Sequence, residues 1–208
     1  MIRKTALLFS RLAATVDLSY QPIMIDWKQL PTLITDRICL RPVSPADIDA
    51  LFKIFSDPEV IRYWAAPALK SRDAATDLVN EIHDRFKRHE MLKWGLALRE
   101  TNLLIGTTTL FNLNLQNERA EIGYGLARDY WGHGYMCEAL RALLQYAFEV
   151  LNLHRLEADV DPRNSASIRT LERLGFKREG YLRERWHINN EIQDTVFFGL
   201  LRSEWKQF

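Results

Sequence analysis

The sequence has 208 residues, of which 47% are hydrophobic, so it is long enough for one domain with a full-sized core. Its 28 basic and 27 acidic residues are interleaved and give a formal net charge of +1, which provides no electrostatic footprint for nucleic acid or a membrane surface. No apolar run approaches the ~20 residues of a membrane span, and the two cysteines lie far apart, so we expect reduced thiols in a cytoplasmic protein.

The N-terminal segment superficially suggests a signal peptide, because Arg3 and Lys4 precede a short apolar run. Arg11 interrupts that run below the ~7 residues an export signal needs, so export is not expected. We expect residues 1–34 to form an arm of unknown role and residues 35–208 to form the domain.

The first half of the domain predicts a strand followed by two helices. The strand covers 37–42, and Ser44 and Pro45 then begin a helix that ends before Pro58. A second helix begins at Ser71. Its apolar positions form one buried face, which leaves two histidines, His83 and His89, on the solvated side.

The loop between these helices is rich in aromatic residues, with Tyr63 and Trp64 at its centre. Such a loop either fills the core or forms a wall of a substrate site, and the sequence does not decide between the two. Trp186, near the C-terminus, is a further candidate for substrate binding.

Three strands in quick succession are predicted at 94–98, 103–111 and 119–126. Their connections are short enough for antiparallel hairpins. The last strand leads into Gly132 and Gly134, after which apolar positions recur every three or four residues through Leu151 and indicate a long amphipathic helix.

A strand, a glycine turn and a helix start together form a place for an anion. The first backbone N–H groups of the helix lack intrahelical partners, and glycines at 132 and 134 let a phosphate approach the main chain. The same pair of glycines also fits an ordinary turn with positive φ. Cys137 stands where a dinucleotide fingerprint needs its third glycine, and no Gly-Lys-Ser/Thr of a P-loop is present.

The C-terminal third predicts a strand at 155–160, a short helix that starts after Asn164 and stops at Gly175, and two closing strands at 176–186 and 193–201. No repeat or linker interrupts the chain. The sequence therefore predicts one α/β (α+β) domain with a mixed, mostly antiparallel sheet flanked by helices.

Two spaced motifs in this order resemble the GNAT superfamily of acetyl-CoA-dependent N-acetyltransferases. One is Trp131-Gly-x-Gly-Tyr135 with Glu138-Ala139, and the other is Asn164 with Ser167, Glu172, Leu174, Gly175 and Phe176. The match covers roughly residues 35–205 and is most similar to the branch that acetylates the N-termini of ribosomal proteins.

The resemblance implies acetyl-CoA as co-substrate, with no metal ion. The main chain of the strand ending at Leu126 would pair with the pantetheine arm, and Asn164 would contact the pantetheine from the following helix. The amides from Gly132 through His133, Gly134, Tyr135 and Met136 would bind the pyrophosphate.

The sequence departs from the family pattern at two positions. Asp129 stands where many relatives carry Gln or Arg, and neighbouring Arg128 is a candidate neutralising partner and cofactor ligand. Leu171 replaces a tyrosine that serves many relatives as proton donor, and the resemblance to the ribosomal-protein branch assigns that role to the hydroxyl of Ser167.

Transfer to an amine needs a neutral nucleophile, and Glu121, on the strand before the glycine turn, is the candidate base. An α-amino group is roughly a tenth neutral at pH 7, whereas lysine is neutral only about a few times in ten thousand, so a modest base suffices for a protein N-terminus. Neither cysteine has a legible histidine partner, which favours direct attack in a ternary complex without a covalent intermediate.

Two other functions stay open. One keeps the chemistry with a small amine acceptor such as an antibiotic, polyamine or amino acid, which acidic residues in candidate substrate loops, Asp57, Glu59 and Glu191, would favour. The other is a non-catalytic acetyl-CoA sensor. The five histidines show no metal-ligand spacing, and the sequence does not indicate the oligomeric state.

Overall fold

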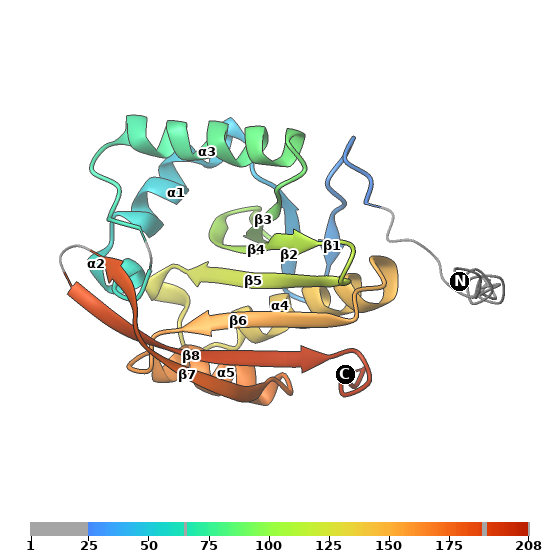
Figure 1. Cartoon of the computed structure of the whole chain (residues 1–208). Coiled ribbons are helices and arrows are strands. Elements are labelled where there is room, and N and C mark those ends of the chain that lie inside the picture. The colour runs from blue at the N-terminus through green and yellow to red at the C-terminus, as the bar shows by residue number, and fades with distance from the viewer. Residues whose placement is uncertain (1–24, 65, 189–190, 208) are drawn as a thin grey trace, which may run out of the picture.

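The structure is a computed structural model that describes residues 25–64, 66–188 and 191–207. The described residues form one eight-stranded sheet in the order β1-β2-β3-β4-β5-β6-β8-β7, in which β5 and β6 are the parallel pair (Figure 1). The strands are β1 Leu33–Ile34, β2 Ile38–Pro42, β3 Met91–Leu98, β4 Leu104–Asn114, β5 Arg119–Leu126, β6 Arg155–Val160, β7 Lys177–Ile188 and β8 Glu191–Leu201.

Helices cover both faces of the sheet (Figure 1). The helices are α1 Ile48–Phe55, α2 Pro58–Ile61, α3 Arg72–Lys87, α4 Tyr135–Gln145 and α5 Ser165–Arg173. One apolar core lies between the sheet and α4 and α5, and a second lies between the sheet and α1 and α3. The predicted fold class, with its mixed and mostly antiparallel sheet, is confirmed.

Strict alternation along the central strands separates the two cores. Leu92, Trp94 and Leu96 of β3 face the core under α4, whereas Met91 lies in the core under α1 and α3. Trp94 is fully buried, and its indole N–H donates to the Pro31 carbonyl oxygen at 2.7 Å. This bond attaches the segment before β1 to the centre of the sheet.

The expected boundary between residues 34 and 35 falls inside the β1–β2 hairpin, where Ile34 pairs with Cys39. Leu30, upstream of it, is buried in the larger core. Residues 1–24 of the expected arm lie outside the described residues. Within the described part of the chain, no helix is both long and apolar enough to cross a bilayer.

Several predicted boundaries are wrong. Strand β3 begins at Met91 rather than at residue 94, β4 runs on to Asn114, and β7 reaches Ile188. A short helix, α2, follows directly on Asp57, whose carboxylate accepts from the Glu59 amide at 2.9 Å. The expected long helix after the glycine turn closes with a π-helical turn, Tyr146–Val150.

The expectation that both histidines are solvated is wrong for His83. This residue is partly buried, and its Nε2 lies 2.8 Å from the carbonyl oxygen of Val43. His89, just after α3, is exposed as expected, although its ring also stacks on Trp27 with centroids 4.5 Å apart. Both partners come from the N-terminal part of the chain, so a helical pattern alone does not reveal them.

The sheet opens at one place, between β5 and β6. Their parallel pairing covers only Arg119–Glu121 against Arg155–Glu157, after which β6 continues to pair with β8 up to Val160. Strand β5 continues to Leu126 with β4 as its neighbour. From residue 122 onward, one edge of β5 therefore has no strand partner.

Candidate functional site

The glycine turn after β5 has the geometry that the sequence predicts. Gly132 and Gly134 have φ of 78° and 80°, and Gly134 is the N-cap of α4. A Cβ on Gly132 would meet no atom within 4 Å, so the conformation, and not lack of space, favours glycine there. No side chain caps this helix end, which leaves its first N–H groups available to an anion.

A clamp between Arg37 and Glu138 holds the turn in place. Arg37 Nε lies 2.7 Å from Glu138 Oε2, Arg37 Nη1 donates to the His133 carbonyl oxygen at 3.0 Å, and its guanidinium lies 4.6 Å from the Tyr135 ring centre. Thr35 also donates to Glu138 at 2.6 Å. Glu138 thus joins the start of α4 to the β1–β2 turn.

These contacts change the acidity of Glu138. Burial raises the pKa of this carboxyl, but hydrogen bonds from Thr35 and Arg37 outweigh it, so the pKa lies below its ordinary value. Sequence reasoning treated residue 37 only as the start of a strand, and it therefore missed the arginine beside the predicted phosphate site.

A cavity of about 370 Å³ begins at the glycine turn and follows the open edge of β5 toward α5. It is lined by four of the residues predicted to bind the cofactor, namely Leu126, Gly132, Met136 and Asn164. The other four do not line it: Arg128 and His133 are exposed, the Tyr135 ring packs on Arg37, and Gly134 lies behind the turn as the N-cap.

Asp129 lies near this turn, where its charge opposes a phosphate. Its carboxylate lies 3.2 Å from Lys53 Nζ, and both side chains are largely exposed. The ion pair therefore comes from α1, and not from Arg128 as the sequence suggested.

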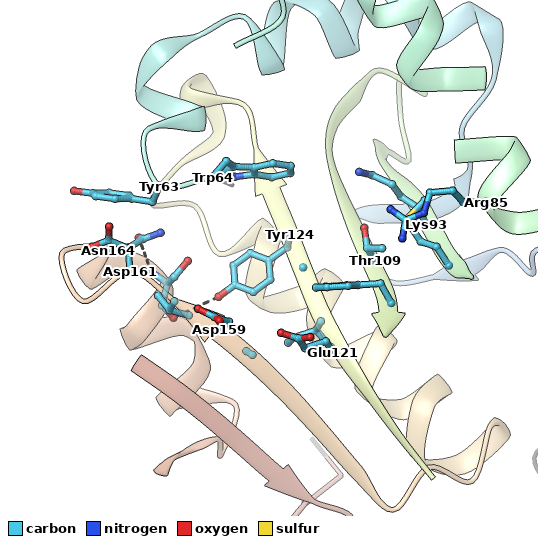
Figure 2. Close-up of a pocket in the computed structure, with 17 residues that line it drawn as sticks. Tyr63, Trp64, Arg85, Lys93, Thr109, Glu121, Tyr124, Asp159, Asp161 and Asn164 are labelled. Carbon is cyan, nitrogen blue, oxygen red and sulfur yellow. Dashed lines mark hydrogen bonds between the residues drawn. The ribbon is translucent and has the colours of Figure 1, made fainter. Parts of the chain in front are cut away.

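A second cavity, of about 400 Å³, lies beyond β5 on the side of α1 and α3 (Figure 2). It shares Tyr63, Trp64, Tyr124, Asn164 and Ser167 with the first cavity. Figure 2 shows Lys93 and Arg85 at one end, Tyr63 and Asn164 at the other, and Glu121 between them. The two cavities therefore meet at one set of side chains.

The predicted base, Glu121, lines the second cavity as the last β5 residue paired with β6. Its carboxylate accepts from Asn112 Nδ2 at 2.5 Å, and it has no ion-pair partner among the described residues. Asp159 and Asp161 also line the cavity, but each is paired with arginine, Asp159 with Arg185 at 3.0 Å and Asp161 with Arg163 at 2.6 Å.

Tyr124 is a site residue that sequence reasoning missed. Burial raises its pKa to about 12, and its hydroxyl donates to the Ser167 carbonyl oxygen at 3.4 Å. The hydroxyl lies at the junction of the two cavities.

The predicted proton donor, Ser167, also lies at this junction. Its backbone N–H donates to Asn164 Oδ1 at 3.1 Å, so Asn164 caps α5 and keeps its amide group as a donor. Leu171, one turn further on, is fully buried in the core and does not reach the cavities.

Of the predicted acceptor residues, Tyr63 and Trp64 line the junction of the two cavities, whereas Trp186 does not. Trp64 packs against Phe55 with centroids 4.9 Å apart and covers Gly125, where a Cβ would lie 2.6 Å from the indole. Trp186 donates to Asp159 at 3.2 Å and lines a smaller cavity of about 230 Å³ together with Tyr63 and Glu121. The aromatic loop therefore fills space over the sheet and also forms a wall.

Neither cysteine lines the cavities, and both are free thiols. Within the described ranges, no cluster of three or more His, Cys, Asp or Glu side chains could hold a metal ion. The groups of the site that can take part in chemistry or bind charge therefore include one carboxylate without an ion pair, the hydroxyls of Tyr124 and Ser167, an uncapped helix end, and the lysine and arginine of the far wall.

Comparison with known proteins gives one family. Residues 37–177 match the model of the acetyltransferase (GNAT) domain. The uncharacterized N-acetyltransferase p20 of Bacillus licheniformis is 36% identical over 176 residues, which cover 85% of this chain and 99% of the relative.

Other relatives differ in the acceptor that their names give. A putative ribosomal N-acetyltransferase, YdaF of Bacillus subtilis, is 31% identical over 83% of this chain and 96% of its own length. A spermidine N(1)-acetyltransferase of Vibrio cholerae is 27% identical over 83% of this chain and 97% of its own. The crystal structure of a GNAT acetyltransferase from Bacillus anthracis superposes with a TM-score of 0.75 at 26% identity, covering 84% of this chain and 100% of the other.

Proposed function

Because the chain belongs to the GNAT acetyltransferase family and is an acetyl-CoA-dependent N-acetyltransferase, we propose that its acceptor is the N-terminal α-amine of a protein. A ribosomal protein is the leading candidate, since a relative at 31% identity carries the name of a ribosomal N-acetyltransferase. The proposal includes a cytoplasmic location, which agrees with the two free thiols.

The charge of the second cavity is the observation that carries this proposal. A polyamine brings several positive charges and needs several unpaired carboxylates to hold them. Glu121 is the one carboxylate of this cavity without an ion pair among the described residues, because Asp159 and Asp161 are held by arginines. A single carboxylate without an ion pair can hold the one positive charge of an α-amine, but not the several charges of a polyamine.

The acidic residues that favoured a polyamine acceptor in the sequence analysis also have partners of their own in the structure. Asp57 caps α2, Glu59 lies 3.8 Å from Arg62, and Glu191 lies 2.6 Å from Arg163. The α-amine also makes the smaller demand on the base, since roughly a tenth of it is neutral at pH 7.

The first cavity fits coenzyme A on two observations. The uncapped start of α4 offers N–H groups to a diphosphate, and the open edge of β5 offers main-chain groups to an extended arm. Met136 and Asn164 would line that arm, and the side chain of Asn164 has N–H groups left to donate.

In the proposed mechanism, acetyl-CoA supplies a thioester, which the amine attacks directly. Glu121 takes a proton from the amine, directly or through water, while the new C–N bond forms and the C–S bond breaks. The Ser167 hydroxyl then gives its proton to the leaving sulfur and regains one from water, while Glu121 releases the proton of the amine to solvent. Tyr63 and Trp64 line the junction and exclude water from it.

The alternative acceptor is a small amine, and the 27% identical spermidine acetyltransferase supports it. The test incubates the purified protein with acetyl-CoA and peptides that begin with serine or alanine, the same peptides with a blocked N-terminus, and spermidine. Mass spectrometry should find one acetyl group on the free N-termini alone. Transfer to spermidine, with none to the peptides, would replace the proposed acceptor.

A further inference from the structure

The second cavity contains a lysine that the proposed chemistry does not use. Lys93, on β3, is partly buried, and among the described residues it has no hydrogen bond and no ion pair. Its ammonium lies near two aromatic rings, those of Phe55 and Trp64, whose centres are each 5.8 Å from Nζ. A lysine in this position, inside a cavity, lacks a counter-ion.

The sheet places Lys93 on the same face as the predicted base. Lys93 pairs with Thr109, and Thr109 pairs with Gly123, two residues after Glu121. Side chains at these positions point to one face, and two strand spacings with one two-residue step put the Cα atoms of Lys93 and Glu121 about 12 Å apart. The ammonium therefore lies at one end of the cavity, and the carboxylate lies between the two ends (Figure 2).

A second positive charge near Lys93, that of Arg85, favours the binding of an anion there. Arg85 of α3 lies at the same end of the cavity, and its own carboxylate partners, Glu90 at 3.4 Å and Glu81 at 4.0 Å, belong to α3 and the turn after it. Burial and the charge of Arg85 lower the pKa of Lys93 to about 8. Lys93 still carries its charge in most molecules at pH 7, and a bound anion would supply the opposite charge that it lacks.

We propose that Lys93 binds an acidic side chain of the acceptor, a carboxylate on the second or third residue after the reacting α-amine. This rests on the proposed function, because it adds a sequence preference to the same acceptor site. An extended peptide advances about 3.4 Å per residue, so those positions span the distance that the lysine and glutamate side chains leave between them. The carboxylate of a free amino acid lies too close to its own amine.

The test compares acceptor peptides that differ only by glutamate or glutamine at position two or three. Initial rates with saturating acetyl-CoA should give the wild-type protein about a tenfold higher kcat/KM for the glutamate peptide, which is the typical strength of a hydrogen bond to a charged group. Lys93→Met should bring the two values together, mainly by raising the KM of the glutamate peptide. Lys93→Glu should make a peptide with lysine at that position the preferred one.

Lys70→Met is the matched control, because Lys70 is exposed and lines neither cavity. It should leave the preference unchanged, and thermal melting should show that each variant is folded. Equal kcat/KM for glutamate and glutamine peptides in the wild-type protein would overturn the role of Lys93 while leaving the α-amine assignment intact. A reversal of preference in Lys93→Glu supports that role even if Lys93→Met is poorly folded.

Discussion

Glu121 combines a position beside the opening of the sheet with a carboxylate that has no ion-pair partner in the described part of the chain. It is the last β5 residue paired with β6, so it lies beside the opening, and it is the one carboxylate of the second cavity without an ion pair in the described part of the chain. A base needs both access to the reacting amine and freedom from a permanent cation. The neighbouring Asp159 has the first property without the second.

Replacing this carboxylate tests its role as base. Glu121→Gln should lower kcat/KM for the peptide acceptor by about a hundredfold at pH 7, because a general base contributes at least that much. The loss should shrink above pH 8, where the α-amine is neutral without help. Rates measured from pH 6 to 9 check this, with Glu100→Gln, in an exposed turn, as the control. An unchanged profile would remove Glu121 from the mechanism.

Two hydroxyls at the junction, those of Ser167 and Tyr124, are candidates for the second proton transfer of the proposed mechanism. Ser167→Ala should lower kcat by about tenfold or more while changing the KM for acetyl-CoA little, because a donor acts in the transition state. Tyr124→Phe keeps the ring and removes only the hydroxyl that bonds Ser167. It should cost less, since its hydroxyl is engaged with that carbonyl. If Tyr124→Phe proves the more damaging variant in steady-state kinetics, the donor is the tyrosine.

At the scale of secondary structure, the start of α4 depends on a contact between distant parts of the chain. Arg37 and Glu138 are 101 residues apart, and their ion pair fixes the turn that carries Gly132 and Gly134. The arginine side chain is half exposed, so solvent weakens the pair, while the carboxylate is mostly buried. The turn is thus held by one well-formed but partly solvated clamp.

The clamp predicts how stability changes with pH. Because the pKa of Glu138 is lowered in the folded state, its stabilising effect is present above the ordinary value of 4.5 and is lost as the pH falls through the folded pKa. Glu138→Gln should cost about 1–2 kcal/mol at pH 7, and the difference from wild type should shrink below pH 4.5. Urea unfolding at several pH values measures it, and a constant difference would contradict the clamp.

The sequence predicted the elements whose signals are local. Ser71, Gly134 and Gly175 mark helix ends through caps and positive φ, and apolar spacing predicted the helix after residue 134. The predicted catalytic pair, Glu121 and Ser167, does line one cavity. Pairing of distant segments has no such local signal, which is why the partners of Arg37 and His83 were missed.

At the scale of the whole molecule, the two cavities share five side chains at one junction. An acceptor and a coenzyme that enter from opposite sides would meet there, with no need for the enzyme to carry the acetyl group in between. Neither cysteine lies on this path. The layout therefore favours a ternary complex over a two-step exchange.

Steady-state kinetics distinguish these two routes. Double-reciprocal plots at several fixed acetyl-CoA concentrations should intersect, as expected when both substrates are bound together. Mass spectrometry of the protein after incubation with acetyl-CoA alone should find no acetyl group on Cys39 or Cys137. Parallel lines together with an acetylated cysteine would establish the two-step route instead.

The proposed role of Lys93 depends on a position that only the assembled sheet reveals. In the sequence it precedes the predicted strand by one residue, because apolar spacing placed the start of that strand at Trp94. Register with β4 and β5 then places it opposite Thr109 and Gly123, on the same face of the sheet as Glu121. A cavity that brings this lysine and this carboxylate together requires three strands in the correct register, which no single segment encodes.

The separation of β5 from β6 has a consequence for the empty enzyme. Main-chain groups that a neighbouring strand would satisfy are left facing solvent in the middle of the sheet, where most proteins keep their most stable pairing. A coenzyme lying there would take the place of an absent strand and complete the ladder. A ligand that binds the folded protein and not the unfolded chain raises the free energy of unfolding, so the melting temperature should rise with the concentration of coenzyme.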